Sequence, residues 1–465
     1  MPQNCRTRLT ALSFLLVATV VCGLAARDVV GQQPTKGSLS TIVVLVEFPD
    51  LRHKVPREAI HRLVFEEVNS YYQEVSFGKV WITGRITDWI TIPNSYRSYV
   101  PEKVDKMPPP HTLATDAIRA VDESVNFRDY QYVFVVAPIG GLAHALMVDI
   151  QTNDGVRVTR VAVVHESADE WRFYAHEFGH LLGLPDLYNP GLKKGERPDD
   201  MDFWDVMSRG AVHFSAWSKI RLGWIEKDQI QDVVRGQIVS VTLEPAERKT
   251  DGKLVLRHQI TPAGQKALQY YLIEVRQHIG FDRNLPGTGV LVIWADDSAK
   301  KDFVKVKDAD PSTDSLDALD TGPSKNRIYL DEKNDFAIIL LYKRGLAYRV
   351  HVTTSGRANT AMQTWSLIED ANSTITKAWQ DPRPAGLDAT RQMLKKAVDS
   401  FDSGNYDQIP GIAKEVKGMV EQATKPKGYF ESVFDAQMII PLIVISGILI
   451  GVFLYHRMHR QKAGR

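Results

Sequence analysis

Hydrophobic and polar positions alternate along the chain in patterns that predict strands and helices in turn. Apolar, β-branched runs at 41–50 and 132–137 predict buried strands. Between residues 79 and 92, apolar positions recur at every second residue, which predicts one bent strand or two shorter strands. Helical spacing of apolar residues predicts helices at 57–75 and 113–125. Together these elements predict a twisted sheet with helices packed against it.

A hairpin and a further helix are predicted next. Apolar segments at 145–151 and 156–164 flank an Asn-Asp-Gly turn, which is a strong hairpin signal. Residues 167–170 have the spacing of a capping box at a helix N-terminus. Aromatic residues and leucines then recur at helical spacing until Gly183, where we expect the helix to end. One face of this helix is therefore expected to pack on the sheet.

The other face of this helix carries the candidate chemistry, in the stretch His176-Glu-Phe-Gly-His180-Leu-Leu-Gly-Leu-Pro-Asp186. Two histidines four residues apart project from the same face and can hold one metal ion. Glu177 lies beside them, where a carboxylate can accept a proton from water during hydrolysis. A left-handed Gly183 would turn the chain and return Asp186 as a third ligand.

The alternative is a helix with two ordinary polar histidines, since the five-residue pattern arises by chance in many proteins. The full eleven-residue form favours the metal site, because it adds a turn glycine and a third oxygen ligand. Met207 follows in a turn after Phe203 and Trp204. A methionine close to two aromatic residues is by default a core residue. We interpret Met207 as a packed floor beneath the metal and not as a ligand.

Three further histidines and one tyrosine lie near this stretch in the sequence. We expect His144, His165 and His213 to be polar surface or pocket residues, because a catalytic zinc needs its fourth position open to water. Tyr188 is a candidate for stabilising an oxyanion, with a packing role as the favoured alternative.

Short strands separated by turns predict a β-sandwich-like region between 238 and 355. Its acidic residues Asp296 and Asp297 and the loop 308–320 are candidates for binding calcium. A solvated acidic loop is the favoured alternative, because the carboxylates lack the regular spacing of a calcium loop. We expect this region to support the preceding one without contributing metal ligands.

The rest of the C-terminal part is predicted to be a stalk and an anchor. A polar segment at 356–386 predicts a linker, and two amphipathic stretches at 387–402 and 409–423 predict a helical hairpin. Residues 436–455 form an apolar stretch of about the 20 residues needed to cross a bilayer. Basic residues in 456–465 place this tail in the cytoplasm by the positive-inside rule.

The N-terminal segment 1–31 has the features of a signal peptide, with Arg6 and Arg8 before an apolar run and small residues after it. Both cysteines, Cys5 and Cys22, lie within it, so we expect no disulfide in the mature protein. The net charge of the chain is +1, and no long basic run occurs outside its two ends. This charge distribution excludes nucleic acid as an expected partner.

The pattern around the motif resembles the immune inhibitor A-like metallopeptidases, family M6, of metzincin type. The resemblance includes the extended motif with Asp186 as third ligand, the turn at 204–207, and the segments 71–79 and 214–224. It covers roughly residues 41–300. It implies a zincin-type catalytic domain, one zinc ion, secretion, and cleavage of peptide bonds in proteins. The absence of a long propeptide departs from the secreted members and leaves the activation mechanism open.

The resulting prediction is an α+β protein with a zincin/metzincin-like catalytic domain, a β-sandwich-like domain, a helical hairpin stalk and a C-terminal transmembrane helix. The expected segments are 1–31 signal peptide, 38–228 zinc metalloprotease catalytic domain, 229–355 β-rich accessory domain, 356–386 linker, 387–425 hairpin stalk, 436–455 transmembrane helix and 456–465 cytoplasmic tail.

The predicted function is a membrane-anchored, extracytoplasmic, zinc-dependent endopeptidase with Glu177 as catalytic base and His176, His180 and Asp186 as metal ligands. It is expected in the cell membrane as a single-pass protein with its N-terminal domains outside the cell. The alternative is a catalytically inactive zincin-fold module for surface binding or adhesion. The intact Glu177 disfavours that alternative. The physiological substrate and the oligomeric state are left open.

Overall fold

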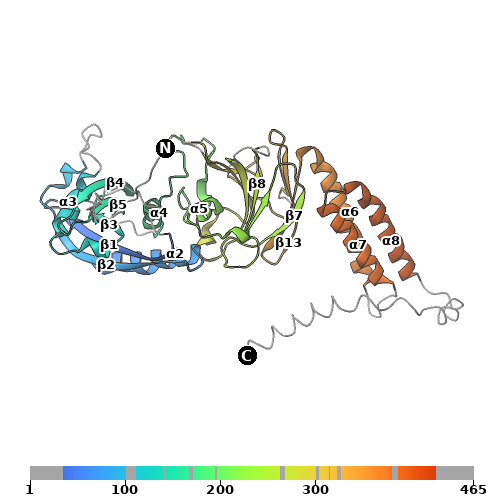
Figure 1. Cartoon of the computed structure of the whole chain (residues 1–465), viewed down its shortest axis with the longest axis horizontal. Helices are drawn as coiled ribbons and strands as arrows, with labels where there is room; N and C mark the ends of the chain where they lie inside the picture. Colours follow the sequence, from blue (N-terminus) through green and yellow to red (C-terminus); the bar gives the residue numbers. More distant parts are fainter. Residues whose placement is uncertain are drawn as a thin grey trace, which may run out of the picture.

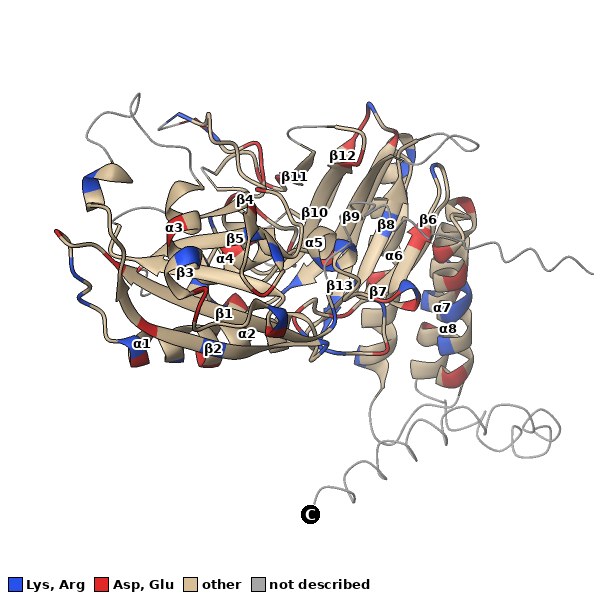
Figure 2. Cartoon of the chain, turned by 60° about the vertical axis from the view of Figure 1, so that its left-hand side comes forward, with Lys and Arg blue, Asp and Glu red and all other residues tan. Residues whose placement is uncertain are grey.

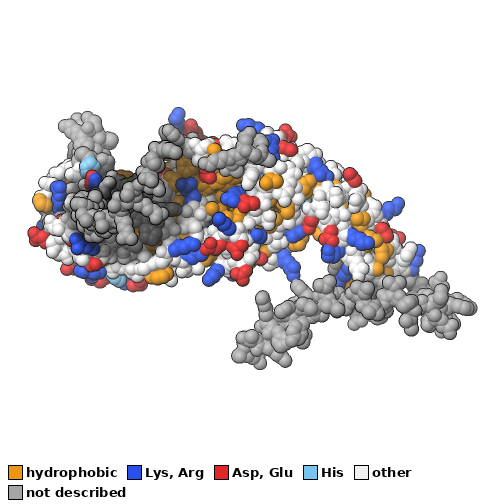
Figure 3. Space-filling view, in the orientation of Figure 1, with side chains coloured by type: hydrophobic (Ala, Val, Ile, Leu, Met, Phe, Trp, Pro, Cys, Tyr) orange, Lys and Arg blue, Asp and Glu red, His pale blue; other side chains and the backbone are white. Residues whose placement is uncertain are grey.

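Three regions follow one another along the long axis of the molecule (Figure 1): a first sheet with its helices, two further sheets, and three helices. The computed structural model describes residues 35–100, 111–139, 143–166, 171–193, 196–261, 268–299, 303–313, 315–321, 326–379 and 386–425. Basic and acidic side chains are interspersed over the face shown in Figure 3.

The first sheet has five strands in the order β2-β1-β3-β5-β4. Their bounds are β1 Gly37–Glu47, β2 Val80–Thr91, β3 Tyr132–Ala137, β4 Ala143–Gln151 and β5 Arg157–His165. Four strands pair in parallel, and the edge strand β4 is antiparallel to β5. The predicted strand at 132–137 and the predicted hairpin are confirmed.

Both faces of this sheet are buried, because successive residues of a strand point to opposite sides. In β1, Val43 and Leu45 belong to one hydrophobic cluster, and Val44 and Val46 belong to another. The first cluster includes α4 (Trp171–Leu181), and the second includes α3 (Thr112–Val121). The sheet is therefore a rigid layer between the helix that carries the motif and the helix on its opposite face.

The predicted helix at 57–75 is confirmed, and a π-helical turn interrupts it. Its parts are α1 Arg57–Arg62, η1 Leu63–Val68 and α2 Asn69–Val75. Of the two alternatives predicted for 79–92, the single strand is confirmed, since β2 is one strand of 12 residues. Gly84 within β2 has φ +150°, and a Cβ atom there would lie 1.7 Å from the Thr41 carbonyl oxygen. Only glycine allows β2 to approach β1 so closely.

The second region contains two sheets, with strand orders β11-β10-β9-β8-β6 and β12-β13-β14-β7. The strands of the first are β6 Ile230–Val233, β8 Val255–Gln259, β9 Gln269–Arg276, β10 Gly289–Asp296 and β11 Val304–Lys307. Those of the second are β7 Val239–Leu243, β12 Ile328–Asp331, β13 Phe336–Arg344 and β14 Ala347–Thr353. The two sheets share one hydrophobic cluster, so they pack face to face.

The second region, which is called the sandwich region from here on, is continuous with the first region. Figures 1 and 2 both show α5 (Ala216–Arg221) between the first sheet and the strands of the second region. Trp204 and Trp217 of the first region share a hydrophobic cluster with Leu272 of β9 and Leu291 of β10. A single core therefore crosses the expected boundary near residue 228.

The expected linker at 356–386 is wrong, because α6 (Ala358–Ala378) occupies most of it. Its buried residues Ala361, Trp365, Ile368 and Ala371 have helical spacing, which the polar composition of the segment obscured. The predicted hairpin helices are present as α7 (Leu387–Asp402) and α8 (Ile409–Thr424). Two hydrophobic clusters join them to α6, so the unit has three helices and not two.

The predicted transmembrane helix at 436–455 and the predicted signal peptide at 1–31 lie outside the described residues. Within the described part of the chain, no helix is long and apolar enough to cross a membrane. The 21-residue helix α6 has the length but is amphipathic. The transmembrane element of the expected fold class is therefore not supported, and the class is corrected to a mixed α/β protein with three C-terminal helices.

Candidate metal centre

Helix α4 packs on the first sheet through one face. Its Phe178 ring lies 5.0 Å from the Tyr132 ring and 5.5 Å from the Phe134 ring, both on β3. Tyr174 stacks on Phe134 as well, at 6.0 Å. The described helix begins at Trp171, and the predicted capping box at 167–170 lies outside the described residues. Aromatic packing therefore fixes which way the opposite face of α4 points.

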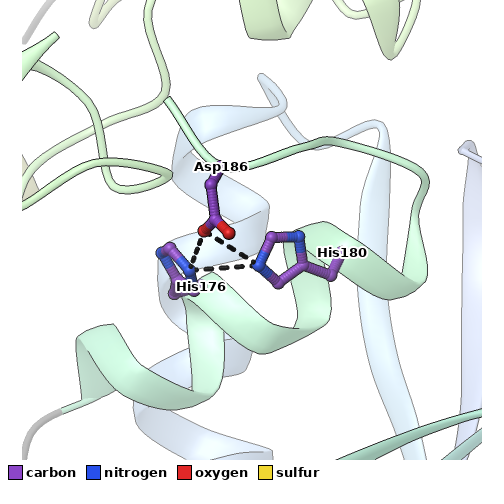
Figure 4. A group of neighbouring side chains, drawn as sticks. All are labelled: His176, His180 and Asp186. Atoms are coloured by element: carbon purple, nitrogen blue, oxygen red, sulfur yellow. Dashed lines mark hydrogen bonds and ion pairs between the residues drawn. The ribbon is translucent and has the colours of Figure 1, made fainter. Parts of the chain in front are cut away.

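The turn after α4 brings the chain back over the helix. Gly183 has φ +97°, the left-handed conformation that glycine adopts without strain. Its N–H donates to the His180 carbonyl at 2.9 Å, and the Leu184 N–H donates to the Gly179 carbonyl at 3.0 Å. This pair of bonds is the Schellman arrangement at a helix C-terminus. It carries Asp186 back toward the two histidines, as Figure 4 shows.

His176, His180 and Asp186 meet at one point. The two Nε2 atoms are 3.1 Å apart, and Asp186 Oδ1 lies 3.1 Å from His176 Nε2 and 3.2 Å from His180 Nε2. A tetrahedral zinc ion with bonds of about 2.0–2.1 Å has ligand atoms roughly 3.3 Å apart. Among the described residues, these three form the group of His, Cys, Asp or Glu side chains that can hold a metal ion.

The remaining ring nitrogens of both histidines are held by backbone carbonyls. His176 Nδ1 donates to the Val206 carbonyl and His180 Nδ1 donates to the Leu184 carbonyl, each at 2.8 Å. Because Nδ1 carries the proton in each ring, the Nε2 lone pairs face Asp186. Such outer contacts orient metal-binding imidazoles. The residues therefore fit a metal ion.

Asp186 keeps its charge in this arrangement. Burial alone would raise the pKa of Asp186, but the adjacent His176 and His180 outweigh it and hold this pKa well below its usual value. A carboxylate that stays ionised is a suitable oxygen ligand for a divalent cation.

Glu177 is the next residue on α4, and it is 3% exposed. Burial raises the pKa of Glu177 to about 7, although the neighbouring His176 and His180 oppose the shift. The Ala145 backbone, on β4, opposes the shift as well. The Glu177 Oε2 atom has no hydrogen-bond partner among the described residues. The geometry thus leaves one oxygen of Glu177 available to a ligand beside the three converging atoms.

Met207 lies directly beneath the helix, fully buried. A Cβ atom on Gly179 would lie 2.4 Å from the Met207 sulfur, so glycine is required at that position of α4. Asp205 shapes the turn, since its carboxylate accepts hydrogen bonds from the Met207 and Ser215 N–H groups at 2.7 and 2.8 Å. The same turn contains Val206, whose carbonyl accepts the hydrogen bond from His176.

Two cavities open on either side of Glu177. One, of about 430 Å³, extends along β4 from Ala143 to Met147. The other, of about 640 Å³, reaches past Phe173 to the turn that holds Met207. Both are lined by His176, Glu177 and Tyr188. The candidate site is therefore a cleft that runs across the metal cluster.

Three further histidines and one tyrosine were predicted to lie near the site. His144 lines the first cavity and His165 lines the second, as expected for pocket residues. His213 is fully buried and bonds Glu74 at 2.7 Å, so the expectation of a surface or pocket position is wrong for it. The ring centroid of Tyr188 lies 6.2 Å from that of His176. Its proposed role toward an oxyanion stays a prediction.

Sequence reasoning missed the residues that support the turn from a distance. Arg276 of β9 is fully buried, and its Nη1 donates to the Trp204 carbonyl at 2.9 Å. Arg209 bonds Asp200 through both terminal nitrogens at 2.9 Å and thereby closes the loop after Asp186. Several aspartates shortly before Arg209 in the segment 199–209 were a visible signal for the second contact, whereas nothing near Trp204 in the sequence pointed to Arg276.

The calcium expectation is not tested. In the acidic loop, Asp308 accepts hydrogen bonds from the backbone N–H groups of Asp310 and Asp317, each at 3.0 Å. Asp296 likewise accepts from the Ser298 N–H at 2.8 Å. These carboxylates shape their own loops, and calcium binding there stays a prediction.

A helix that presents two histidines and a glutamate, with an aspartate returned by a glycine turn, has the donor set of a metal-dependent hydrolase. Residues 147–221 match the family model of the immune inhibitor A peptidase M6 catalytic domain. This match supports a metallopeptidase, with a peptide or protein as its substrate and a metal as its cofactor. No curated protein matches the chain.

The matched segment runs from β4 to the end of α5 and contains His176, Glu177, His180, Asp186 and Met207. The expected resemblance over residues 41–300 is wider than this match. Strands β1 to β3, the helices that precede β4, the sandwich region and the three C-terminal helices lie outside it.

Proposed function

We propose that the protein is a zinc-dependent endopeptidase in which His176, His180 and Asp186 hold the metal and Glu177 is the general base. The observation that carries this proposal is the buried Glu177 carboxylate, one oxygen of which has no hydrogen-bond partner among the described residues, beside three ligand atoms within 3.2 Å of one another. A purely structural carboxylate at this depth would be expected to be fully hydrogen-bonded.

Zinc is proposed because two imidazoles and one carboxylate, with a further position open, form a catalytic zinc set. When bound, zinc supplies a Lewis acid that polarises a carbonyl and lowers the pKa of water. Glu177 accepts a proton from the attacking water and delivers it to the leaving amine. The surrounding protein buries this carboxylate and keeps bulk water from it.

The substrate is proposed to be an extended peptide that pairs with β4. This strand lies at the edge of its sheet, and its residues from Ala143 to Met147 line the cleft. An exposed strand edge binds a peptide through backbone hydrogen bonds, while cavities select the side chains. Met147 is 68% exposed at this edge, which suits a contact with substrate.

The alternative, an inactive module for binding or adhesion, requires the same fold without turnover. Glu177 argues against it, because burial of a carboxylate without a full set of partners costs stability. That cost has a chemical reason only if the group transfers a proton.

We further propose that the catalytic region lies outside the cytoplasm. This rests on the sequence alone, namely the signal-like segment 1–31 and the confinement of both cysteines to it. Protease added to intact cells should then degrade the catalytic region. Full protection of this region in intact cells, with digestion only after lysis, would contradict the location and leave the peptidase proposal untouched.

Two substitutions in the site test the roles separately. Glu177→Gln removes the base but keeps the three ligands, so it should retain zinc and lower peptide hydrolysis by about 10²–10⁴-fold. Asp186→Ala removes a ligand oxygen and should release zinc at low free metal, because two protein ligands remain. The measurements are kcat/KM on a peptide mixture and metal content of purified protein.

Zinc should also stabilise the folded protein. At a free zinc concentration 1,000 times its dissociation constant the gain is about 4 kcal/mol, and a chelator should remove it. The matched control is Asp186→Ala, whose unfolding should respond little to the chelator. Full zinc content and full activity in Asp186→Ala would contradict the assignment of Asp186 as the third ligand. Full activity in Glu177→Gln would contradict the assignment of Glu177 as the base.

A further inference from the structure

Arg160 lines the cavity that follows β4, although the proposed catalysis does not use it. It belongs to β5 and stands opposite Met147 of β4, and both residues line this cavity of about 430 Å³. Ala143, at the start of β4, lines both cavities of the cleft, so it lies level with the metal cluster. The cavity therefore extends along the strand from the metal cluster to an arginine.

The contacts of the Arg160 guanidinium are with neutral groups. Its Nη1 donates to the Leu181 carbonyl at 3.2 Å, at the C-terminus of α4. No carboxylate forms an ion pair with Arg160 in the part of the chain that the structure describes. Tyr132 lies within reach of this charge, but burial raises the pKa of Tyr132, so its phenol stays neutral. An arginine has five N–H donors, so one bond to a carbonyl positions the charge without cancelling it.

The two carboxylates of this cavity belong to its metal end. Asp186 lies 3.1 Å from His176 Nε2 and 3.2 Å from His180 Nε2, so these imidazoles and a bound metal ion share its charge. Glu177 is 3% exposed on the same helix face. Neither carboxylate pairs with Arg160 among the described residues. The cavity is therefore divided into an acidic end that fits the metal and a basic end at Arg160.

Apolar side chains line the cavity beside Arg160. Leu181 and Leu184 are buried where they line it, and Met147 is 68% exposed on β4. A guanidinium makes its strongest hydrogen bonds with a carboxylate, which it binds through two N–H groups at once. An occupant with an apolar stem and a terminal carboxylate matches both features. Glutamate is the amino acid with the longest stem of this kind.

The direction of β4 indicates which part of a substrate meets Arg160. Antiparallel pairing is the more stable arrangement per residue, and a peptide antiparallel to β4 passes Met147 before Ala143. The peptide residues opposite these two positions are four apart, since paired strands advance together. Arg160 also reaches back to Leu181, the residue after His180. It therefore faces the stretch of about four residues on the amino-terminal side of the scissile bond.

We propose that Arg160 makes the enzyme selective for peptides with a glutamate among the four residues before the scissile bond. The inference rests on the proposed peptidase function and adds its substrate class. Arg160 acts as a specificity residue, because its guanidinium binds a substrate side chain and not the reacting atoms.

Matched peptides with glutamate, glutamine or lysine at one of these four positions test the inference. At one position or more, the zinc-loaded full-length protein should cleave the Glu peptide with kcat/KM about tenfold or more above the Gln peptide, and further above the Lys peptide. Mass spectrometry of the fragments identifies the bond that is cut in each peptide. The preference should shrink as the salt concentration rises, because salt screens a partly exposed ion pair.

Three substitutions of Arg160 separate its charge from its shape. Arg160→Gln should bring the Glu and Gln peptides to within about twofold of each other. Arg160→Lys keeps a charge without the planar fork and should retain part of the preference. Arg160→Glu should reverse it, so that the Lys peptide is cut faster than the Glu peptide. A merely structural role would change the cleavage of all peptides alike and leave these ratios unmoved.

Arg157→Gln is the matched control. Arg157 also lies on β5, but outside the described lining of this cavity, and its Nε donates to Asp149 at 2.6 Å. Its substitution should preserve the Glu preference.

Two results would overturn the inference and leave the peptidase function standing. One is equal cleavage of Glu and Gln peptides by the wild-type protein at all four positions, which decides the matter even if no variant of Arg160 folds. The other is an unchanged preference in folded Arg160→Gln. No cleavage of any peptide by zinc-loaded wild-type protein would overturn the proposed function itself, and the inference with it.

Discussion

Glu177 of the cleft and Glu274 of the sandwich region form a natural pair for comparison. Both are buried glutamates, and burial is the main cause that raises the pKa of each. Glu274 has partners for both oxygens, since one accepts from the Ala216 N–H at 2.9 Å and the other from Arg276 at 3.3 Å. In contrast, Glu177 Oε2, at the wall of two cavities, has no hydrogen-bond partner in the part of the chain that the structure describes.

Burial and a raised pKa therefore do not by themselves mark a reactive group. Around Glu274, the fully buried Arg276 also bonds Asp282 at 2.8 Å and the Trp204 carbonyl at 2.9 Å. Such a cluster satisfies its charges internally and joins the two regions. Around Glu177 the missing partner is replaced by access to a cavity, which is what proton transfer to a substrate requires.

The largest expected effect concerns the Arg276 cluster. Arg276→Met leaves Asp282 and Glu274 buried without their partner, which should cost about 3–5 kcal/mol of unfolding free energy. Denaturant unfolding measures it. The matched control is Arg257→Met on the neighbouring strand β8, whose pair with Asp232 is partly exposed and should contribute about 1 kcal/mol or less. Equal losses for both variants would show that the buried cluster is not special.

The next effect concerns the contribution of a buried histidine to the pH dependence of stability. His258 of β8 is 1% exposed, neither ring nitrogen has a hydrogen-bond partner within the described part of the chain, and His258 lines neither cavity of the candidate metal centre. Burial lowers its pKa to about 4, with Arg235 adding to the shift and Asp335 opposing it.

Because the folded pKa of His258 lies below the unfolded value of about 6.5, the unfolded chain binds the proton first. The stability contributed by neutral His258 is present above pH 6.5 and is lost as pH falls toward 4, by at most about 3 kcal/mol. Unfolding free energy measured from pH 7 to 4 should fall less steeply in His258→Phe. Identical slopes in the two proteins would contradict this account.

The smallest effect concerns the packing beneath the metal cluster. In Gly179→Ala the new methyl group meets the Met207 sulfur at 2.4 Å, which should cost about 1–3 kcal/mol. Gly411→Ala on α8 is the control, because nothing lies within 4 Å of its new methyl group. That change should be neutral or stabilising by up to about 1 kcal/mol. A destabilised Gly411→Ala with an unaffected Gly179→Ala would reverse the assignment of the tight contact.

The local part of the site could be predicted from the sequence because it depends on short-range geometry. His176 and His180 share a helix face by their spacing, and Gly183 allows the turn that returns Asp186. Strand β3 and the hairpin of β4 and β5 were likewise predictable, since turn residues and alternation act over a few positions. All of these features lie within stretches of about 20 residues.

Long-range contacts were decided by the tertiary structure alone. Nothing in the sequence assigns the Val206 carbonyl to His176 or brings Arg276 to Trp204, a residue 72 positions away. The helix α6 was hidden because its polar composition resembles a linker until its buried face meets α7 and α8. Residue types and spacing set local conformation, whereas the partners of a buried polar group depend on which distant segments the packed core brings to it.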